Sequence, residues 1–139
     1  MNTIIIEQIR PELTWRLRRD VMYPDQNISE MKMPEDNDGY HFAAFNEKYI
    51  IGVISLFHKG TDFQFRKFAV ANDEQGKGTG TILLSYVLDF AIAMGAKRIW
   101  CNSRVTAIGF YQRFGMVQTG KTYSNIGIDY EVMEKIIES

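Results

Sequence analysis

The chain has 139 residues, of which 45% are hydrophobic and 24% are charged, and its formal net charge is −1 at pH 7. This composition fits a globular domain with a substantial core and excludes disordered and fibrous proteins. The near-neutral charge provides no basic field for nucleic acid, and no apolar run approaches the roughly 18 residues needed to span a bilayer.

Cysteine and histidine are scarce. The single cysteine, Cys101, excludes a disulfide within the chain, and with only two histidines, His41 and His58, it argues against a metal site. The first ten residues, MNTIIIEQIR, lack the layout of a signal peptide. We therefore expect one domain over residues 1–139, in the cytoplasm, with no metal and no nucleic-acid or membrane partner.

The N-terminal part predicts a strand, a helix and an irregular segment. The β-branched run at residues 3–6 is typical of a strand. Apolar residues at four-residue spacing predict a helix over residues 11–22, which begins at a proline and which Pro24 ends. Residues 24–39 carry prolines and acidic side chains, with one helical turn expected at 28–31. This segment is interpreted either as a binding loop or as a solvated acidic linker.

The next three segments predict an antiparallel meander. Residues 40–45 and 49–57 are strand-like, and the short polar connection between them is typical of a hairpin. The second strand is apolar almost throughout, so we expect it to be central and buried on both faces. Residues 63–70 follow another turn and form the third strand of the meander.

The second half of the chain predicts one parallel crossover. An amphipathic run predicts a helix over residues 81–94, and residues 99–101 predict a short strand after it. Together with the strand at 63–70 they form a β-α-β unit, whose two strands should be parallel.

The last elements are a short helix at residues 107–114 and two strands at 117–119 and 128–136, separated by a polar connection at 120–127. The complete order is β-α-β-β-β-α-β-α-β-β. A meander combined with a single crossover predicts an α+β, or mixed α/β, fold rather than a doubly wound parallel sheet.

One glycine-rich stretch, Gln75-Gly76-Lys77-Gly78-Thr79-Gly80, stands between the third meander strand and the long helix. Alternate glycines let a ligand approach the backbone, and the helix start presents unpaired N–H groups that suit a phosphate. The G-x-G-x-G spacing fits neither a P-loop nor the dinucleotide fingerprint, which also needs a carboxylate where this chain has Asn102. A glycine-rich turn without a ligand is the alternative.

Three motifs resemble those of the GNAT superfamily of acyl-CoA-dependent N-acetyltransferases. The glycine-rich stretch matches the family pattern of arginine or glutamine followed by x-x-G-x-G/A. Residues 101–104 and 107–116 resemble the family's asparagine-bearing strand end and its A-x-x-F-Y-x-x-x-G-F helix. The segment 127–133 resembles the ending of a bacterial subgroup of small GNAT proteins.

The resemblance implies a fold and a coenzyme A site. The fold has a central, mixed, mostly antiparallel sheet with helices on both faces and a parallel strand pair that splays apart. Backbone groups of Phe68 and Val70 would bind the pantetheine arm, Asn102 would cap the opened strand or bind the arm, and Phe110 would pack near the cofactor. The pyrophosphate would be surrounded by Gln75, Gly76, Lys77, Gly78, Thr79 and Gly80.

The implied activity is transfer of an acetyl group from acetyl-CoA to a primary amine of a small molecule or peptide, by direct attack in a ternary complex. Tyr111 is the candidate general acid, because a phenol carries a proton at pH 7. A non-catalytic acyl-CoA sensor and a module for another diphosphate nucleotide are the alternatives. Exposed strands in the C-terminal half leave room for a homodimer.

The general base and the acceptor are not specified by these motifs. The excess of acidic side chains in residues 24–39 mildly favours a cationic acceptor such as a polyamine. Four carboxylates are candidates to bind or deprotonate the amine, with simple solvation as the alternative for each: Glu35, Asp36, Asp38 and Asp129. Cations that either line the acceptor side or lie on solvated surface are Arg18, Arg19 and Lys32. Cys101 is interpreted as an inert buried thiol.

Overall fold

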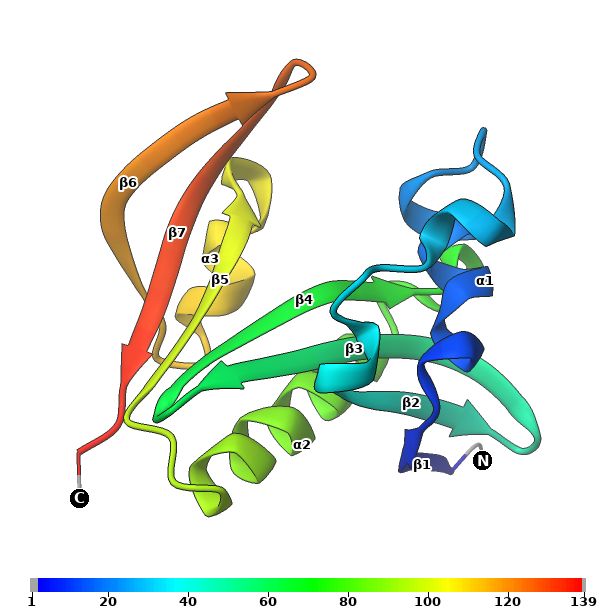
Figure 1. Ribbon diagram of the computed structural model, residues 1–139, viewed down its shortest axis with the longest axis horizontal. Helices are drawn as coiled ribbons and strands as arrows, with labels where there is room; N and C mark the ends of the chain where they lie inside the picture. The colour runs from blue at the N-terminus through cyan, green and yellow to red at the C-terminus, as the bar shows by residue number, and fades with distance from the viewer. Residues whose placement is uncertain (1–2, 139) are drawn as a thin grey trace.

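The computed structural model describes residues 3–138 and contains one sheet of seven strands in the order β1-β2-β3-β4-β5-β7-β6 (Figure 1). The strands are β1 (Ile4–Ile9), β2 (Tyr40–Asn46), β3 (Tyr49–Lys59), β4 (Asp62–Val70), β5 (Arg98–Arg104), β6 (Val117–Asn125) and β7 (Ile128–Ile136). Every neighbouring pair is antiparallel except β4 and β5, which are parallel. The predicted meander, parallel crossover and mixed fold class are confirmed.

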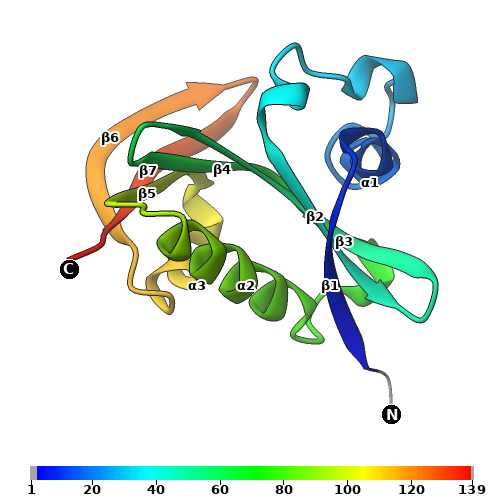
Figure 2. The same cartoon turned by 60° about the horizontal axis from the view of Figure 1, so that its bottom comes forward.

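Helices cover both faces of the sheet, as predicted (Figure 2). One face carries the N-terminal helical segment, which includes α1 (Trp15–Leu17), and the other carries α2 (Thr79–Ala93) and α3 (Ile108–Gln112). The predicted helix at 11–22 is helical throughout but not regular, because a 3₁₀ turn precedes α1 and a π turn follows it. Residues 51–56 of β3 are buried, which confirms a central strand covered on both faces.

The predicted polar connection at residues 120–127 is wrong. β6 runs to Asn125, and a two-residue turn, Ile126 and Gly127, joins it to β7; both turn residues have positive φ, which suits a tight hairpin. β6 is an edge strand exposed to solvent over almost its whole length. Its sequence is polar for that reason, so it lacks the apolar alternation by which a strand is predicted.

The predicted strand at 99–101 is also too short. β5 extends to Arg104, because Asn102, Ser103 and Arg104 pair with residues of β7. These three residues are polar and gave no strand signal in isolation.

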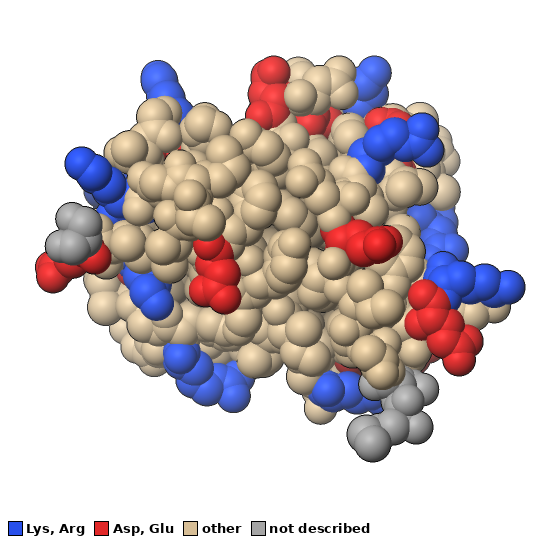
Figure 3. Space-filling view, turned by 90° about the horizontal axis from the view of Figure 1, so that it is seen from below, with Lys and Arg blue, Asp and Glu red and all other residues tan. Residues whose placement is uncertain are grey.

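The outer face of α2 is largely uncharged, and Figure 3 shows charged side chains mainly around the rim of that view. Exposed apolar side chains on and just after α2 are Ile82, Tyr86, Ile92 and Met94. A homodimer stays a prediction. Within residues 3–138, no helix is both long and apolar enough to cross a bilayer.

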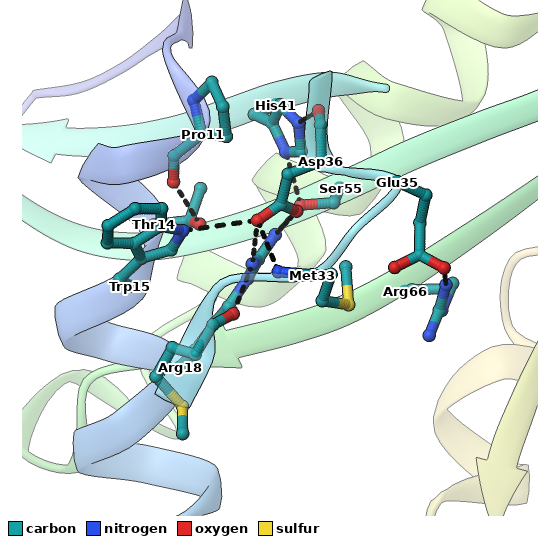
Figure 4. Close-up of polar contacts among 11 residues, drawn as sticks. Pro11, Thr14, Trp15, Arg18, Met33, Glu35, Asp36, His41, Ser55 and Arg66 are labelled. Carbon is teal, nitrogen blue, oxygen red and sulfur yellow. Dashed lines mark hydrogen bonds and ion pairs between the residues drawn. The ribbon is translucent and has the colours of Figure 1, made fainter. Parts of the chain in front are cut away.

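The segment between α1 and β2 is held against the sheet by a buried ion pair (Figure 4). Arg18 donates to both carboxylate oxygens of Asp36 at 2.9 and 3.0 Å, to the Met31 carbonyl oxygen at 3.0 Å and to Ser55 Oγ at 2.9 Å. Both charged side chains are nearly inaccessible to solvent. Burial alone would raise the pKa of Asp36, but the hydrogen bonds from Arg18 and from the Met33 N–H, together with the charge of Arg18, outweigh it and hold that pKa below its ordinary value.

His41 completes the network, and its tautomer follows from its partners. A carbonyl oxygen only accepts, so Nε2 carries the proton and donates to the backbone oxygen of Asp36 at 2.6 Å. Nδ1 then accepts from the Ser55 hydroxyl at 2.7 Å, while Ser55 accepts from Arg18. Burial lowers the pKa of His41 against the smaller opposing effect of Asp36, so the buried ring is held in its neutral form.

This network predicts a loss of stability in mild acid. Because the pKa of His41 is lowered from 6.5, the unfolded chain binds more protons than the folded protein as the pH falls through that value. We expect the free energy of unfolding, measured by urea denaturation, to fall between about pH 7.5 and about pH 5. The contribution of Asp36 is lost only at more acid pH, below its ordinary value of 3.8.

The change His41→Gln keeps one donor and one acceptor but removes the titration, so the stability of this variant should vary less over the same range. His58→Gln is the matched control, since His58 is the other histidine and is exposed. An equal pH dependence in wild type and His41→Gln would contradict the assignment.

Candidate active site

The parallel pairing of β4 and β5 is short. It covers only three register pairs, Asp62 with Arg98, Phe63 with Ile99 and Gln64 with Trp100. Beyond them β4 stays bonded to β3 and β5 stays bonded to β7, so the two strands diverge, as Figure 1 shows. Residues 65–68 of β4 and Cys101, Asn102 and Arg104 of β5 line a cavity beyond this point.

The free backbone groups of β4 face this opening. Ala69 lies opposite Val53, and the Ala71 N–H donates to the Ile51 carbonyl oxygen at 2.8 Å, so alternate residues of β4 point toward β3. Phe68 and Val70 therefore direct their backbone groups away from β3. The Val70 carbonyl oxygen accepts a hydrogen bond from Gln75 Nε2 at 3.0 Å on this side.

The glycine loop ends in the N-terminus of α2. Gly76 and Gly78 have φ of +78° and +87°, and Gly78 is the N-cap, so α2 begins at Thr79, earlier than the predicted residue 81. The first backbone bond of the helix runs from the Ile82 N–H to the Gly78 carbonyl oxygen at 3.1 Å. The N–H groups of residues 79–81 precede that bond and have no partner within the helix, which makes this end suited to an anion.

Gly80 brings the loop, β4 and α3 together. A Cβ atom there would lie 3.4 Å from Phe68 Cζ, 3.6 Å from Val70 Cγ2 and 3.8 Å from Phe110 Cζ. The helix start therefore packs against both the end of β4 and the aromatic face of α3.

These elements enclose a cavity of about 600 Å³, which we call the loop cavity. Predicted site residues that line it are Phe68, Val70, Gln75, Gly76, Gly78, Gly80, Phe110 and Tyr111. Three predicted residues lie elsewhere. Lys77 is on the exposed outer side of the loop, 3.4 Å from a carboxylate oxygen of Glu74, Thr79 is buried, and Asn102 lines the neighbouring cavity.

Arg113 is a lining residue that the sequence reasoning missed. Its guanidinium carbon lies 5.4 Å from the centre of the Phe110 ring. Arg113 is the C-cap of α3, three residues after Phe110, so a search for a cation at that spacing from Phe110 would have found it.

Tyr111 stands between two cavities. It lines the loop cavity and a second cavity of about 630 Å³, which we call the acceptor cavity after the role that we propose for it below. Its ring packs against Phe65 and Phe110, with centroids 5.7 and 5.2 Å away. Burial, with a smaller effect of Cys101, raises the pKa of the Tyr111 phenol, so this group keeps its proton at any physiological pH. Burial also raises the pKa of the Cys101 thiol to about 12, which leaves it un-ionised.

The acceptor cavity lies between β4, β5 and the β6–β7 turn. Its polar and charged lining residues are Tyr23, Arg66, Lys67, Gln75, Asn102, Arg104, Tyr111, Asn125 and Tyr130. Its apolar ones include Met22, Phe65, Ile126 and Ile128. No carboxylate and no histidine is among the lining residues that the structure describes.

The four carboxylates considered as bases lie outside this lining. Asp36 is committed to the buried pair with Arg18, and Glu35 pairs with Arg66 at 3.4 Å (Figure 4). Asp38 is exposed, and Asp129 accepts a hydrogen bond from the Ser124 hydroxyl. Residues 24–39 therefore supply no described lining residue of the cavity, and the reason for expecting a cationic acceptor is lost.

Known proteins resemble the whole chain. The family model of the acetyltransferase (GNAT) domain matches residues 9–137. The uncharacterized N-acetyltransferase YitI of Bacillus subtilis (strain 168) is 23% identical over 144 residues, which cover 96% of this chain and 97% of that protein.

Two solved structures share the fold at low sequence identity. A proposed N-acetyltransferase from Lactobacillus plantarum superposes with a TM-score of 0.85 at 18% identity, covering 97% of this chain and 99% of that one. A GNAT family acetyltransferase from Elizabethkingia anophelis, solved with acetyl-CoA bound, has a TM-score of 0.73 at 18% identity and covers 96% and 98%.

Proposed function

The chain belongs to the acetyltransferase (GNAT) domain family, and from that premise we propose that it moves the acetyl group of acetyl-CoA to a primary amine by direct attack in a ternary complex. The observation that carries the proposal is the divergence of β4 and β5, with a cavity on each side of Tyr111. One cavity suits a pyrophosphate and an extended arm, and the other is left for the acceptor.

Acetyl-CoA would occupy the loop cavity. The N–H groups at the start of α2 would bind the pyrophosphate, with Arg113 and Lys77 adding positive charge. The pantetheine amides would bond to the backbone groups of Phe68 and to the Val70 carbonyl oxygen, which can accept a second hydrogen bond beside that from Gln75, as an added strand bonds to a sheet edge. This course leads the thioester toward Tyr111, while Asn102 lies on the acceptor side.

The chemistry then needs few groups. The neutral amine attacks the thioester carbonyl carbon, and the Val70 N–H, which points into the opening, stabilises the developing oxyanion. The C–S bond breaks as the intermediate collapses, and the Tyr111 phenol gives its proton to the leaving thiolate. The amine nitrogen loses its proton to water, since no carboxylate or histidine is among the described lining residues of the acceptor cavity, and the Tyr111 phenolate takes a proton back from water.

A thiol-release assay with a panel of primary amines, run beside calorimetric titration of acetyl-CoA, tests this function. We expect saturable release of coenzyme A with at least one amine. Binding of acetyl-CoA without turnover on any amine would overturn the enzyme in favour of a sensor. Equal affinities for ADP and coenzyme A would instead indicate a site for diphosphates in general.

Gly78 provides a test of the coenzyme A site. The change Gly78→Ala places a side chain at a φ of +87°, which costs about 1–2 kcal/mol, and distorts the N-terminus that would hold the pyrophosphate. We expect acetyl-CoA to bind about 10-fold more weakly by calorimetry.

Gly60→Ala is the matched control. Gly60 has a φ of +62° in the β3–β4 turn, with open space around it as at Gly78. Its variant should bear similar strain and bind acetyl-CoA like wild type. Equal losses in the two variants would mean that strain, not the site, causes the effect.

Tyr111→Phe tests the general acid. Removing the hydroxyl should lower kcat by about 100-fold, because proton transfer from a positioned acid contributes at least that factor, while the packing of the ring is kept. The KM for acetyl-CoA should change little. Tyr86→Phe, on the outer face of α2, is the control. Unchanged turnover in Tyr111→Phe would exclude this role.

A further inference from the structure

The acceptor cavity has an unbalanced positive charge. Three cations line it, Arg66 and Lys67 from β4 and Arg104 from β5. The other described lining residues include no carboxylate. The three come from strands that have diverged, so they approach the cavity from opposite sides. Such a site favours an anion and disfavours a polyamine.

The partners of these cations leave most of their charge uncompensated. Lys67 Nζ donates to the Tyr23 hydroxyl at 2.7 Å, which is a neutral partner. Arg66 is one-third exposed and pairs with Glu35. Arg104 is exposed, and within residues 3–138 no carboxylate pairs with it. Among residues 3–138, only one carboxylate, that of Glu35, therefore pairs with any of the three cations.

The backbone at Lys67 shows that this arrangement is built at a cost. Lys67 has a φ of +54°, in the left-handed region that side chains rarely adopt, and it lies at a bulge where the pairing of β3 and β4 shifts register. A bulge changes the direction in which a side chain projects from its strand. Here it places a lysine on the wall of the cavity.

We propose that the acceptor is a primary amine that also carries an anionic group, a carboxylate or a phosphate, which Arg104, Lys67 and Arg66 bind. An α-amino acid meets this description. This inference rests on the proposed function, because it names the substrate class of the same site. The described lining residues of the cavity include no carboxylate that would hold the amine as an ammonium ion, and nearby cations favour its neutral, nucleophilic form.

Matched acceptors test the charge preference. In the thiol-release assay, leucine is compared with leucinamide and with isoamylamine, which lack the carboxylate, and 2-aminoethyl phosphate is compared with ethanolamine. We expect kcat/KM to be about 10-fold or more higher for the anionic member of a set. The two sets distinguish a carboxylate from a phosphate. Higher kcat/KM for the neutral amines, or for spermidine, would overturn the proposal.

Variants locate the anion site. In Arg104→Gln, the ratio of kcat/KM for the anionic acceptor to that for its neutral counterpart should fall about 10-fold, mainly through KM, and Lys67→Gln should act in the same direction. Arg104→Lys keeps the charge and should retain most of the ratio. Arg10→Gln is the control, because Arg10 is 78% exposed and pairs with Glu12 outside the cavity. An unchanged ratio in both Arg104→Gln and Lys67→Gln would overturn the assignment.

Equilibrium binding separates this inference from the proposed function. Leucine and 2-aminoethyl phosphate are titrated calorimetrically into the protein saturated with coenzyme A, for wild type and Arg104→Gln. Binding that weakens in the variant supports the anion site even where no amine is acetylated, in which case the proposed function alone fails. Turnover of neutral amines with no binding of either anion overturns this inference and leaves the proposed function standing.

Discussion

The site depends on the point at which β4 and β5 stop pairing. Beyond Gln64 and Trp100 each strand keeps only its outer neighbour, so the interior of the sheet contains backbone groups with no strand partner. Unpaired backbone polar groups inside a protein are costly, and an extended ligand with amide groups can satisfy them. The divergence also separates the end of β4 from the end of β5 widely enough for cavities on both sides of Tyr111. Binding groups and space therefore arise from one feature of the topology.

The charge of the acceptor cavity depends on which cations the nearby carboxylates pair with. Asp36 forms a buried ion pair with Arg18 that anchors the segment before β2. Because both side chains are buried and paired, neither is available to bind a ligand. Glu35 is held by Arg66 at the edge of the acceptor cavity. The segment 24–39 is acidic in sequence, but it supplies none of the described lining residues of the acceptor cavity, whose wall is basic. Net charge along a segment says little about a site until the pairing of each carboxylate is known.

Much of the fold was predictable because its signals are local. The glycine loop, the helix after it and the Phe110-Tyr111 pair are contiguous, and the structure brings most of the predicted site residues to one cavity. The edge strand β6 was missed because its residues face water and show no apolar alternation. The acceptor cavity was missed for another reason. Lys67 and Arg104 are far apart in the chain, and only the fold brings them to opposite sides of the same cavity.

Tyr111 shows how packing and chemistry are coupled in this site. Its neighbour Phe110 lies close to Gly80 at the start of α2, so the helix that would hold the pyrophosphate also fixes the position of α3. The same packing buries the phenol and raises its pKa, so Tyr111 remains a proton donor and does not ionise. The raised pKa also makes the phenol a weaker acid, so its contribution to the proposed proton transfer rests on its position beside the leaving sulfur and not on acid strength. The cofactor site and the proposed acid are therefore parts of one packed unit, and the acceptor cavity is free to vary beside it.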